Sequence, residues 1–412
     1  MLKVVSGYYV IHVEGENLDS ATVVGRIVML RLATSQLQPG MIIARNIFSA
    51  NGKLLLSENA ILDEHLIAKL GTLGIDSVFV RHPHLEITPQ EIVNEETRVE
   101  IIKMASQAFG NIRENRTFNL TGISEAMKKL IEDAIGNRHV LIQMTDIRAR
   151  ADYTFGHSIN VCLLSIMIGI KMNLNHQQLL ELAMGAILHD LGMLLVPAEI
   201  LQKTDSLSPT DWKLIQTHTE KGFEIIRRVG PIPLVSAHVA FQHHENFDGT
   251  GYCRGLLGEN IHIYARIVAV ADLYDAITSD RPYRKSFLPH EAYDIMLASR
   301  GTKLDPKIVD LFLENVVIYP VGTTVLLDTG EIGVVVEIHP QLQVRPVVRI
   351  IIDQFGNPWP GPEKLVDFTK DLIRFIVKVL KPEEIFSLRA NACKNKSSLK
   401  GEGVPIDGKC YD

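Results

Sequence analysis

The chain has 412 residues, too many for one ordinary domain, and its 46% hydrophobic and 22% charged content is that of a globular protein. A net charge of −6 argues against affinity for nucleic-acid polymers, which need a basic face. The cysteines are scattered without a CxxC pair, which argues against a disulfide framework and a thiolate zinc site.

The start of the chain gives no sign of export. The N-terminus lacks the charged-then-apolar order of a signal peptide, and no apolar run is long enough to cross a membrane. We therefore predict a cytoplasmic protein without a membrane partner. Residues 1–29 do not join obviously to the β-rich segment after them. Two interpretations stay open: they belong to the protein, or translation starts naturally at Met29 and they form an upstream extension.

Residues 30–85 predict a small β-rich accessory domain. Short apolar runs flank Asn51 and Gly52, and an Asn-Gly pair in that setting is a strong hairpin signal. Apolar residues at helical spacing over 66–73 then predict a helix, and "SVFV" predicts a closing strand. Residues 86–122 are polar with helical spacing, and we expect a helical connector there.

Residues 123–318 look helical throughout. Apolar residues recur at three- and four-residue spacing in "ISEAMKKLIEDAI", "HSINVCLLSIMIGIKM" and "YARIVAVADLYDAIT", and prolines punctuate the breaks. We therefore predict a mainly α fold, in which a helical bundle is flanked by small β-rich N- and C-terminal units.

The period of the apolar pattern changes near residue 320. Two β-branched runs around 328–331 predict a hairpin, "RPVVRIIID" predicts a third strand, and a helix is expected at 370–380. We assign these elements to a small β-rich C-terminal unit over residues 319–382. Residues 390–412 are polar with glycine and lysine, which predicts a disordered tail.

Histidines and aspartates recur on separate predicted helices or at helix ends within the helical region. They are His157, His189, Asp190, His218, His243, His244 and Asp272. A helical bundle builds metal sites in this way, from side chains that project inwards. Imidazole and carboxylate without thiolate suit iron, manganese, zinc or nickel. Seven ligands exceed the needs of one ion, whereas two ions bridged by a carboxylate would use them all.

The charge of such a centre favours phosphate-ester hydrolysis. Two divalent ions and two aspartates leave about +2, which attracts an anion and lowers the pKa of a bound water. Each residue alone also has a structural interpretation, because a lone histidine in an apolar helix is more often part of the core. The signal lies in the set and its order.

Four motifs carry a resemblance to a known family. "LHDLG", "HTEKG", "QHHENFDGTGYCRG" and "ARIVAVADLYDAITSDRPYR" resemble, in this order, the HD-GYP family of cyclic di-GMP phosphodiesterases, a branch of the HD-type metal-dependent phosphohydrolases. The resemblance covers about residues 120–315 and implies an HD-type helical catalytic domain over 123–318. It implies that the seven residues bind two divalent ions, with iron or manganese preferred over zinc or nickel. Asp190 would bridge the ions as a catalytic residue.

The resemblance also implies which residues meet the substrate, cyclic di-GMP. The loop "DGTGYCRGLLGENI" corresponds to the family's GYP loop, so Tyr252 is expected to lie against the ligand and to take part in catalysis. Arg281 and Arg284 would bind the phosphodiester through their forked donors. Asp275, one helical turn after the last predicted ligand, would bind substrate or support a ligand.

The sequence departs from the family pattern at three positions. Cys253 stands where the family has the proline of GYP, which should loosen the loop. Met193 replaces a lysine that often follows HDxG, which removes a cation near the phosphate. Tyr153 stands where some members carry a glutamate for a third metal, and Asp152 is a poor substitute, so we expect two metals.

Three functions are weighed. The leading hypothesis is a cytoplasmic signal-transduction enzyme that hydrolyses cyclic di-GMP to pGpG, and further to GMP, by a metal-activated hydroxide. A homodimer is one possible oligomeric state of this enzyme. The second is a module that binds cyclic di-GMP with little turnover, because of Met193 and Cys253. The third is an HD phosphohydrolase for another nucleotide.

Overall fold

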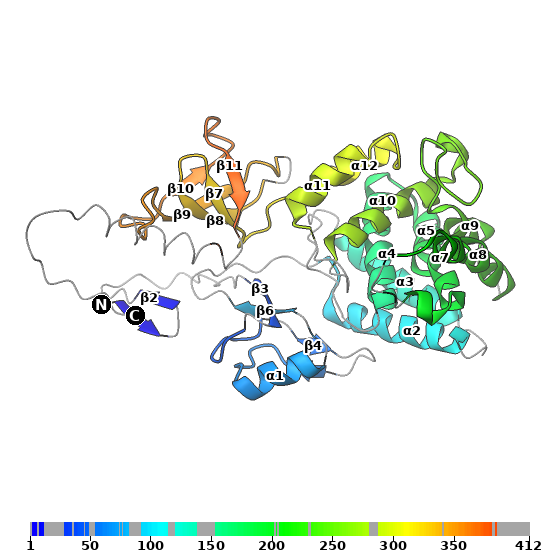
Figure 1. Cartoon of the computed structure of the whole chain (residues 1–412), viewed down its shortest axis with the longest axis horizontal. Coiled ribbons are helices and arrows are strands. Elements are labelled where there is room, and N and C mark those ends of the chain that lie inside the picture. Colours follow the sequence, from blue (N-terminus) through cyan, green and yellow to red (C-terminus); the bar gives the residue numbers. More distant parts are fainter. Residues whose placement is uncertain are drawn as a thin grey trace, which may run out of the picture.

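The computed structural model describes most of the helical region and the greater part of both flanking units. The described residues are 2–5, 8–11, 29–34, 37–44, 46–48, 54–73, 75, 77–81, 92–113, 120–137, 153–201, 203, 206–229, 232–279, 287–339, 342–380 and 384. Helices dominate the middle of the chain, and strands lie before and after them (Figure 1). The predicted fold class, mainly α with β-rich flanks, is confirmed.

The helices from α2 to α12 form the helical body. They are α2 (Glu95–Arg113), α3 (Leu120–Gly136), α4 (Tyr153–Lys171), α5 (His176–Leu188), the 3-10 helix η2 (Leu191–Leu195), α6 (Ala198–Leu201), α7 (Pro209–Gln216), α8 (His218–Val229), α9 (Leu234–Gln242), the 3-10 helix η3 (Gly258–Asn260), α10 (Ile263–Thr278), α11 (Pro289–Ala298) and α12 (Pro306–Leu313). In Figure 1 they gather in one part of the molecule, coloured from cyan to yellow.

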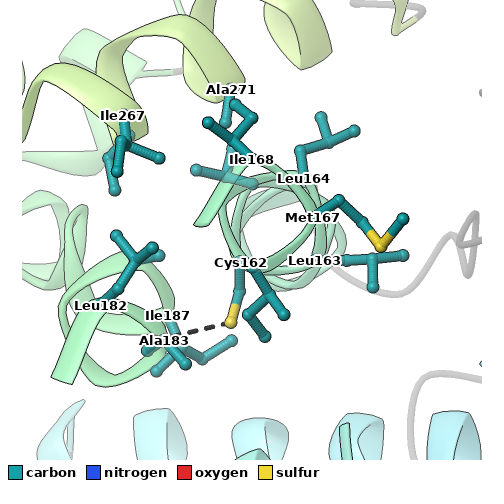
Figure 2. Close-up of a cluster of buried hydrophobic side chains, with 14 of the residues drawn as sticks. Cys162, Leu163, Leu164, Met167, Ile168, Leu182, Ala183, Ile187, Ile267 and Ala271 are labelled. Atoms are coloured by element: carbon teal, nitrogen blue, oxygen red, sulfur yellow. Dashed lines mark hydrogen bonds between the residues drawn. The ribbon is translucent and has the colours of Figure 1, made fainter. Parts of the chain in front are cut away.

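Helix α4 lies at the centre of this body, between α5 and α10. Figure 2 shows Cys162 of α4 directed at α5, where its thiol donates to the carbonyl of Ala183 at 3.5 Å. Ile267 and Ala271 of α10 lie beside α4 in the same view. Burial of these apolar side chains is what fixes the three helices against one another. Helices α4 and α10 each carry one predicted metal ligand, and a third directly follows the last residue of α5.

Helix α2 is part of the helical core. Ile101 and Ile102 on α2, with Ile92 and Val93 just before it, are buried in one cluster with residues of α4 and α5. The helix packs against α3 and α4. The connector predicted for residues 86–122 therefore contributes to the core of the domain that comes after it in the chain.

Helix α5 begins at a defined cap and stays largely buried. The Asn175 side chain accepts from the backbone of Gln178, and the Gln178 side chain accepts from the backbone of Asn175. By length and composition alone, His176–Leu195 is the one helical stretch of the described residues that could cross a membrane, and 61% of that window is buried. Its packing in the core of the helical body accounts for its apolar character.

The N-terminal unit has its own small core. Strand β3 (Met29–Ala33) pairs antiparallel with β6 (Ser77–Arg81), β4 (Ile47–Phe48) pairs with β5 (Leu54–Leu56), and α1 (Glu64–Thr72) packs beside them. The predicted strand pairing on either side of Asn51-Gly52 is confirmed, while the turn itself lies outside the described residues. A further antiparallel pair, β1 (Leu2–Val5) and β2 (Tyr8–Ile11), forms in the segment that we considered as an upstream extension.

The C-terminal unit is a five-stranded antiparallel sheet in the order β10-β9-β8-β7-β11. Its strands are β7 (Thr324–Leu327), β8 (Ile332–Glu337), β9 (Val347–Ile352), β10 (Leu365–Asp367) and β11 (Ile376–Val379). The predicted hairpin and third strand are confirmed. The helix expected at 370–380 is wrong, because β11 pairs with β7, and Ile376 and Val379 pack on the sheet core. The predicted tail at 390–412 lies outside the described residues.

Candidate metal centre

The seven predicted ligands come together in two groups. One group contains Asp190, His218, His243 and His244, and the other contains His157, His189 and Asp272. Within each group the ligand atoms lie within 4.8 Å of one another. Side chains that are far apart in the sequence thus form one cluster inside the helical body.

Most of these residues stand at helix ends, where the chain can direct neighbouring side chains to one point. His189 caps the C-terminus of α5, and Asp190 begins the tighter turn of η2. His218 is the first residue of α8, and His243 caps the C-terminus of α9. The two remaining helices, α4 and α10, contribute from within their length.

Gly192 allows η2 to touch the start of α8. A Cβ at this position would overlap the carbonyl oxygen of His218 and would lie 2.7 Å from the backbone nitrogen of Gly222. Any other residue would therefore push the two backbones apart. This close approach brings the His189-Asp190 pair beside His218.

The carboxylate of Asp190 lies between the two groups. Its Oδ1 is 3.4 Å from Nε2 of His218 and 3.6 Å from Nε2 of His243. Its Oδ2 is 3.5 Å from Nε2 of His189 and 3.8 Å from Nε2 of His157. Each oxygen faces one group, which is the arrangement that a bridging carboxylate requires.

Three of the imidazoles are held from behind by backbone carbonyls. Nδ1 of His189 donates to the carbonyl of Ala186 at 2.7 Å. In the same way, Nδ1 of His218 donates to the carbonyl of Ile215 at 2.6 Å, and Nδ1 of His243 donates to that of Ala240 at 3.1 Å. A carbonyl can only accept, so each Nδ1 carries a proton, and in the neutral ring that a metal ion requires each Nε2 keeps its lone pair. These contacts aim the lone pairs at the centre, as the supporting partners of metal-binding histidines do.

Asp275 takes the place of a carbonyl behind His157. Its Oδ2 lies 2.7 Å from Nδ1 of His157, and its Oδ1 accepts from the side-chain amide of Asn160 at 2.7 Å. The residue is 1% exposed. Of the two roles predicted for Asp275, support of a ligand fits this geometry better than contact with the substrate, because both oxygens are engaged on the side of His157 away from the cluster. Asn160 was missed, and its position one turn after His157 was the only available signal.

Two features indicate that the centre is built for cations. Among the residues that the structure describes, Nε2 of His189 is buried without a hydrogen-bond partner. Nε2 of His218 and Nε2 of His243 lie 3.3 Å apart, although both nitrogens carry lone pairs. An orphaned acceptor and two opposed lone pairs are unfavourable in a buried site unless a cation lies between them. The donor set therefore fits divalent metal ions.

The electrostatics of the cluster keep its carboxylates ionised. Burial would raise the pKa of Asp190, but the imidazoles around it, His189 first, hold that pKa well below its usual range. Burial would also raise the pKa of Asp272, but the hydrogen bond with His157 and the charges of the nearby imidazoles together outweigh burial and lower that pKa. Burial lowers the pKa of His244 well below its usual value, so this imidazole stays neutral, as a metal ligand must.

The glycine-rich loop after α9 brings Tyr252 to the edge of the cluster. The rings of Tyr252 and His244 are 5.0 Å apart between centroids and 32° from parallel, and the backbone N–H of Tyr252 donates to the carbonyl of His244 at 3.2 Å. A Cβ on Gly251 would overlap the backbone nitrogen of Asn246 and lie 2.5 Å from the carbonyl oxygen of His244. Glycine at this position is what lets the loop fold back.

Glu245 is a buried neighbour of the cluster to which the sequence analysis gave no role. It is 3% exposed, and its two oxygens accept from the backbone N–H groups of Arg254 (2.7 Å) and Leu256 (2.9 Å). Cys253, which lies just before Arg254, donates its thiol to the carbonyl of Phe241 at 3.4 Å. The loop without the family's proline is thus fastened by other contacts.

The remaining predicted residues are placed only in part. Arg281, Arg284 and Asp152 lie outside the described residues, as does the side chain of Tyr153. Met193 is half-buried in η2, and its backbone N–H donates to the carbonyl of Asp190 at 2.9 Å. The roles expected for these side chains stay predictions.

The fold and the cluster define the class of protein as an HD-type helical domain with a histidine and aspartate metal centre. A family model of the HD domain matches residues 126–308. A second model, a KOW domain associated with the HD domain, matches residues 324–388, which contain the five-stranded sheet.

Curated phosphodiesterases are similar to parts of this chain. The cyclic di-GMP phosphodiesterase PA4108 of Pseudomonas aeruginosa is 32% identical over 259 residues, 63% of this chain and 62% of that protein. A cyclic di-GMP phosphodiesterase of Thermotoga maritima is 30% identical over 253 residues, 61% of this chain and 68% of that one. The 3'3'-cGAMP-specific phosphodiesterase 3 of Vibrio cholerae is 34% identical over 161 residues, 39% of this chain and 35% of that protein.

This chain belongs to the HD-GYP family of HD-domain proteins. It spans 62% of the length of the Pseudomonas relative and 35% of the Vibrio relative, so neither is matched from end to end.

Proposed function

We propose that this protein hydrolyses cyclic di-GMP to pGpG, and further to GMP, at the cluster around Asp190. One observation carries the proposal: the two oxygens of Asp190 face two separate ligand groups. Two divalent ions, preferably iron or manganese, would be held there. The residues for one ion are Asp190, His218, His243 and His244, and those for the other are Asp190, His157, His189 and Asp272.

When bound, the ions would neutralise phosphate charge and lower the pKa of a water molecule that attacks the phosphodiester. The chain itself supplies orientation and exclusion of bulk water. Asp190 joins the two ligand groups, and the Nδ1 contacts fix the tautomers of three imidazoles. Burial, with Asp190 and Asp272 nearby, raises the pKa of Tyr252, so its hydroxyl stays protonated and can donate to a bound nucleotide.

Arg281 and Arg284 complete the proposed substrate site. Helix α10 brings Asp272 to the cluster and ends at Thr278, shortly before both arginines. A guanidinium presents a planar fork of donors that matches a phosphodiester. We propose that these two side chains bind the phosphates and that other residues bind the bases.

Cyclic GMP-AMP is a second candidate substrate. The observation in its favour is the 34% identity with a relative named as specific for 3'3'-cGAMP. Both cyclic dinucleotides present the same phosphodiester to a metal centre and differ in one base. The cluster itself therefore serves either substrate, and the choice depends on contacts with the bases.

The test is metal analysis of anaerobically purified protein, joined to a hydrolysis assay with manganese or ferrous iron. The substrates are cyclic di-GMP, 3'3'-cGAMP and linear pGpG. We expect two ions per chain and turnover of cyclic di-GMP. Binding without turnover would favour the signalling module, preference for 3'3'-cGAMP would favour the second candidate, and protein that takes up no metal would refute the proposal.

A cytoplasmic location and a homodimer belong to the same proposal. The cysteines that the structure describes, Cys162 and Cys253, are unpaired thiols, as a reducing compartment leaves them. Light scattering of the metal-loaded protein tests the dimer directly, because a mass of one chain would contradict it.

A further inference from the structure

A buried carboxylate fastens the loop that carries Tyr252. Glu245 directs one oxygen to the backbone N–H of Arg254 and the other to that of Leu256, at 2.7 and 2.9 Å. Among the described residues no lysine or arginine pairs with it, so these two N–H groups compensate for its burial. The loop segment from 251 to 256 is thereby tied to the residue that directly follows His244.

His244 is supported differently from the other imidazoles. In the part of the chain that the structure describes, its ring makes no hydrogen bond, whereas the other four rings are each held through Nδ1. It is held instead by ring packing, against His243 at 4.1 Å, Tyr252 at 5.0 Å and His218 at 5.1 Å between centroids. Of these three rings, Tyr252 is the one that the loop carries, so the position of the loop contributes to the orientation of His244.

We infer that Glu245 is a positioning residue, which fastens the loop so that Tyr252 keeps the His244 imidazole aimed at the cluster. The inference rests on the proposed function, in which His244 binds a metal ion. A carboxylate is needed because both of its oxygens accept. A glutamine would turn its NH₂ group towards one of the two N–H groups and leave that donor unpaired.

The rest of the loop is held independently of Glu245. The backbone N–H groups of Phe247 and Asp248 donate to the carbonyls of Lys303 and Thr302, at 3.0 and 2.9 Å. The N–H of Gly258 donates to the carbonyl of Phe247 at 2.9 Å. Removal of the carboxylate should thus release residues 251–256 while the remainder of the helical body keeps its fold.

The first experiment measures metal binding to the full chain without nucleotide. Glu245→Gln is titrated with cobalt(II), and we expect one of the two ions to bind about 10- to 100-fold more weakly, the usual effect of losing a supporting partner, with an altered visible spectrum. Glu259→Gln is the matched control, because Glu259 is exposed on η3 and, among the described residues, forms an ion pair with the exposed Lys307 alone, at 3.9 Å. The control should bind both ions as the wild type does.

Tyr252 variants test the second step of the path. Tyr252→Phe keeps the aromatic ring and should bind cobalt with the affinity of the wild type. Tyr252→Leu lacks the ring, and its cobalt affinity should fall as much as that of Glu245→Gln. If both residues act through His244, the double variant Glu245→Gln/Tyr252→Leu loses no more than the larger single loss. Additive losses would overturn the inference.

A thiol probe reports the loop itself. Alkylation of Cys253 by iodoacetamide, measured on its peptide by mass spectrometry, should be several-fold faster in Glu245→Gln than in the wild type. Cys162, 0% exposed in the core, should stay protected and so reports the fold. If Cys162 also reacts, the variant has unfolded. The inference is then tested by the cobalt affinities of Tyr252→Phe and Tyr252→Leu instead.

The two proposals fail in different ways. Wild-type protein that binds no cobalt would refute the metal centre and, with it, the proposed function. Wild-type protein that binds two ions, together with a Glu245→Gln variant of unchanged affinity and unchanged Cys253 protection, would refute only the role of Glu245.

Discussion

Asp275 and Asp272 hold the His157 imidazole from opposite sides. Oδ2 of Asp275 lies 2.7 Å from Nδ1 of the ring, and Oδ1 of Asp272 lies 3.1 Å from Nε2. Burial would lower the pKa of His157, but the hydrogen bonds and the negative charges of these two carboxylates together outweigh burial and hold that pKa well above its usual value. One imidazole thus joins a carboxylate of the cluster to a carboxylate behind it.

Asp275→Asn should weaken metal binding by about 10- to 100-fold, because it removes the charged acceptor behind a ligand. The Michaelis constant for the nucleotide should not change, since Asp275 is buried behind His157. Metal titration and steady-state kinetics check both points. Asp294→Asn, an exposed aspartate on α11, is the control. A raised Michaelis constant with intact metal binding would favour the other predicted role of Asp275, contact with the substrate.

Asp190→Ala should abolish metal binding and hydrolysis together. The substitution removes the carboxylate that faces both ligand groups, so neither group keeps its full set of ligands. Metal content is measured on the purified variant beside its activity. A variant that retains two ions per chain would show that another residue forms the bridge.

Gly192→Ala should destabilise the protein by roughly 1–3 kcal/mol, the usual cost of forcing atoms into a packed site. The added methyl would overlap the His218 carbonyl and separate η2 from α8. Denaturant unfolding gives the free energy of unfolding. Gly110→Ala is the matched control on α2, where a Cβ meets nothing within 4 Å, and it should be neutral or stabilising. Equal effects would contradict the steric argument.

Arg284→Ala should raise the Michaelis constant or lower kcat while the metal content stays full. The guanidinium is proposed to bind the phosphodiester and is not among the metal ligands. Kinetics with cyclic di-GMP and metal analysis of the same preparation test this. Loss of metal from the variant would exclude a role confined to substrate.

Met193→Lys is expected to increase turnover. Met193 lies in η2, three residues after Asp190, where a lysine would add a positive charge near the phosphate. We expect a higher kcat with unchanged metal content. An unchanged rate would mean that a side chain at this position does not reach the phosphate.

The metal cluster was predictable because its residue types are chemically restricted and their order along the chain is distinctive. The hairpin around residues 328–331 was predictable because its signal, two β-branched runs on either side of a turn sequence, lies within one short stretch of the chain. The supporting contacts were not predictable. No sequence signal indicates that the carbonyls of Ala186 and Ile215 accept from metal-binding histidines. For Asp275, the sequence was compatible both with substrate binding and with support of a ligand, and its burial favours the second role.

Errors arose where distant contacts override local spacing. Residues 370–380 carry an apolar spacing that suggested a helix, but the free edge of β7 and the sheet core draw Ile376 and Val379 into a strand. Residues 86–122 do contain a helix, α2, as predicted, but their polar composition did not reveal that Ile101 and Ile102 are buried in the core of the helical body. In both segments the deciding partner lies elsewhere in the chain.

The opposed Nε2 atoms of His218 and His243 have a consequence for the survival of the protein in a cell. Without a cation, their lone pairs repel where α8 meets the end of α9, so that junction should open more often. Each opening offers backbone to proteases, and a bound ion suppresses it by mass action. Starvation for the metal would then lower the amount of the protein as well as its activity.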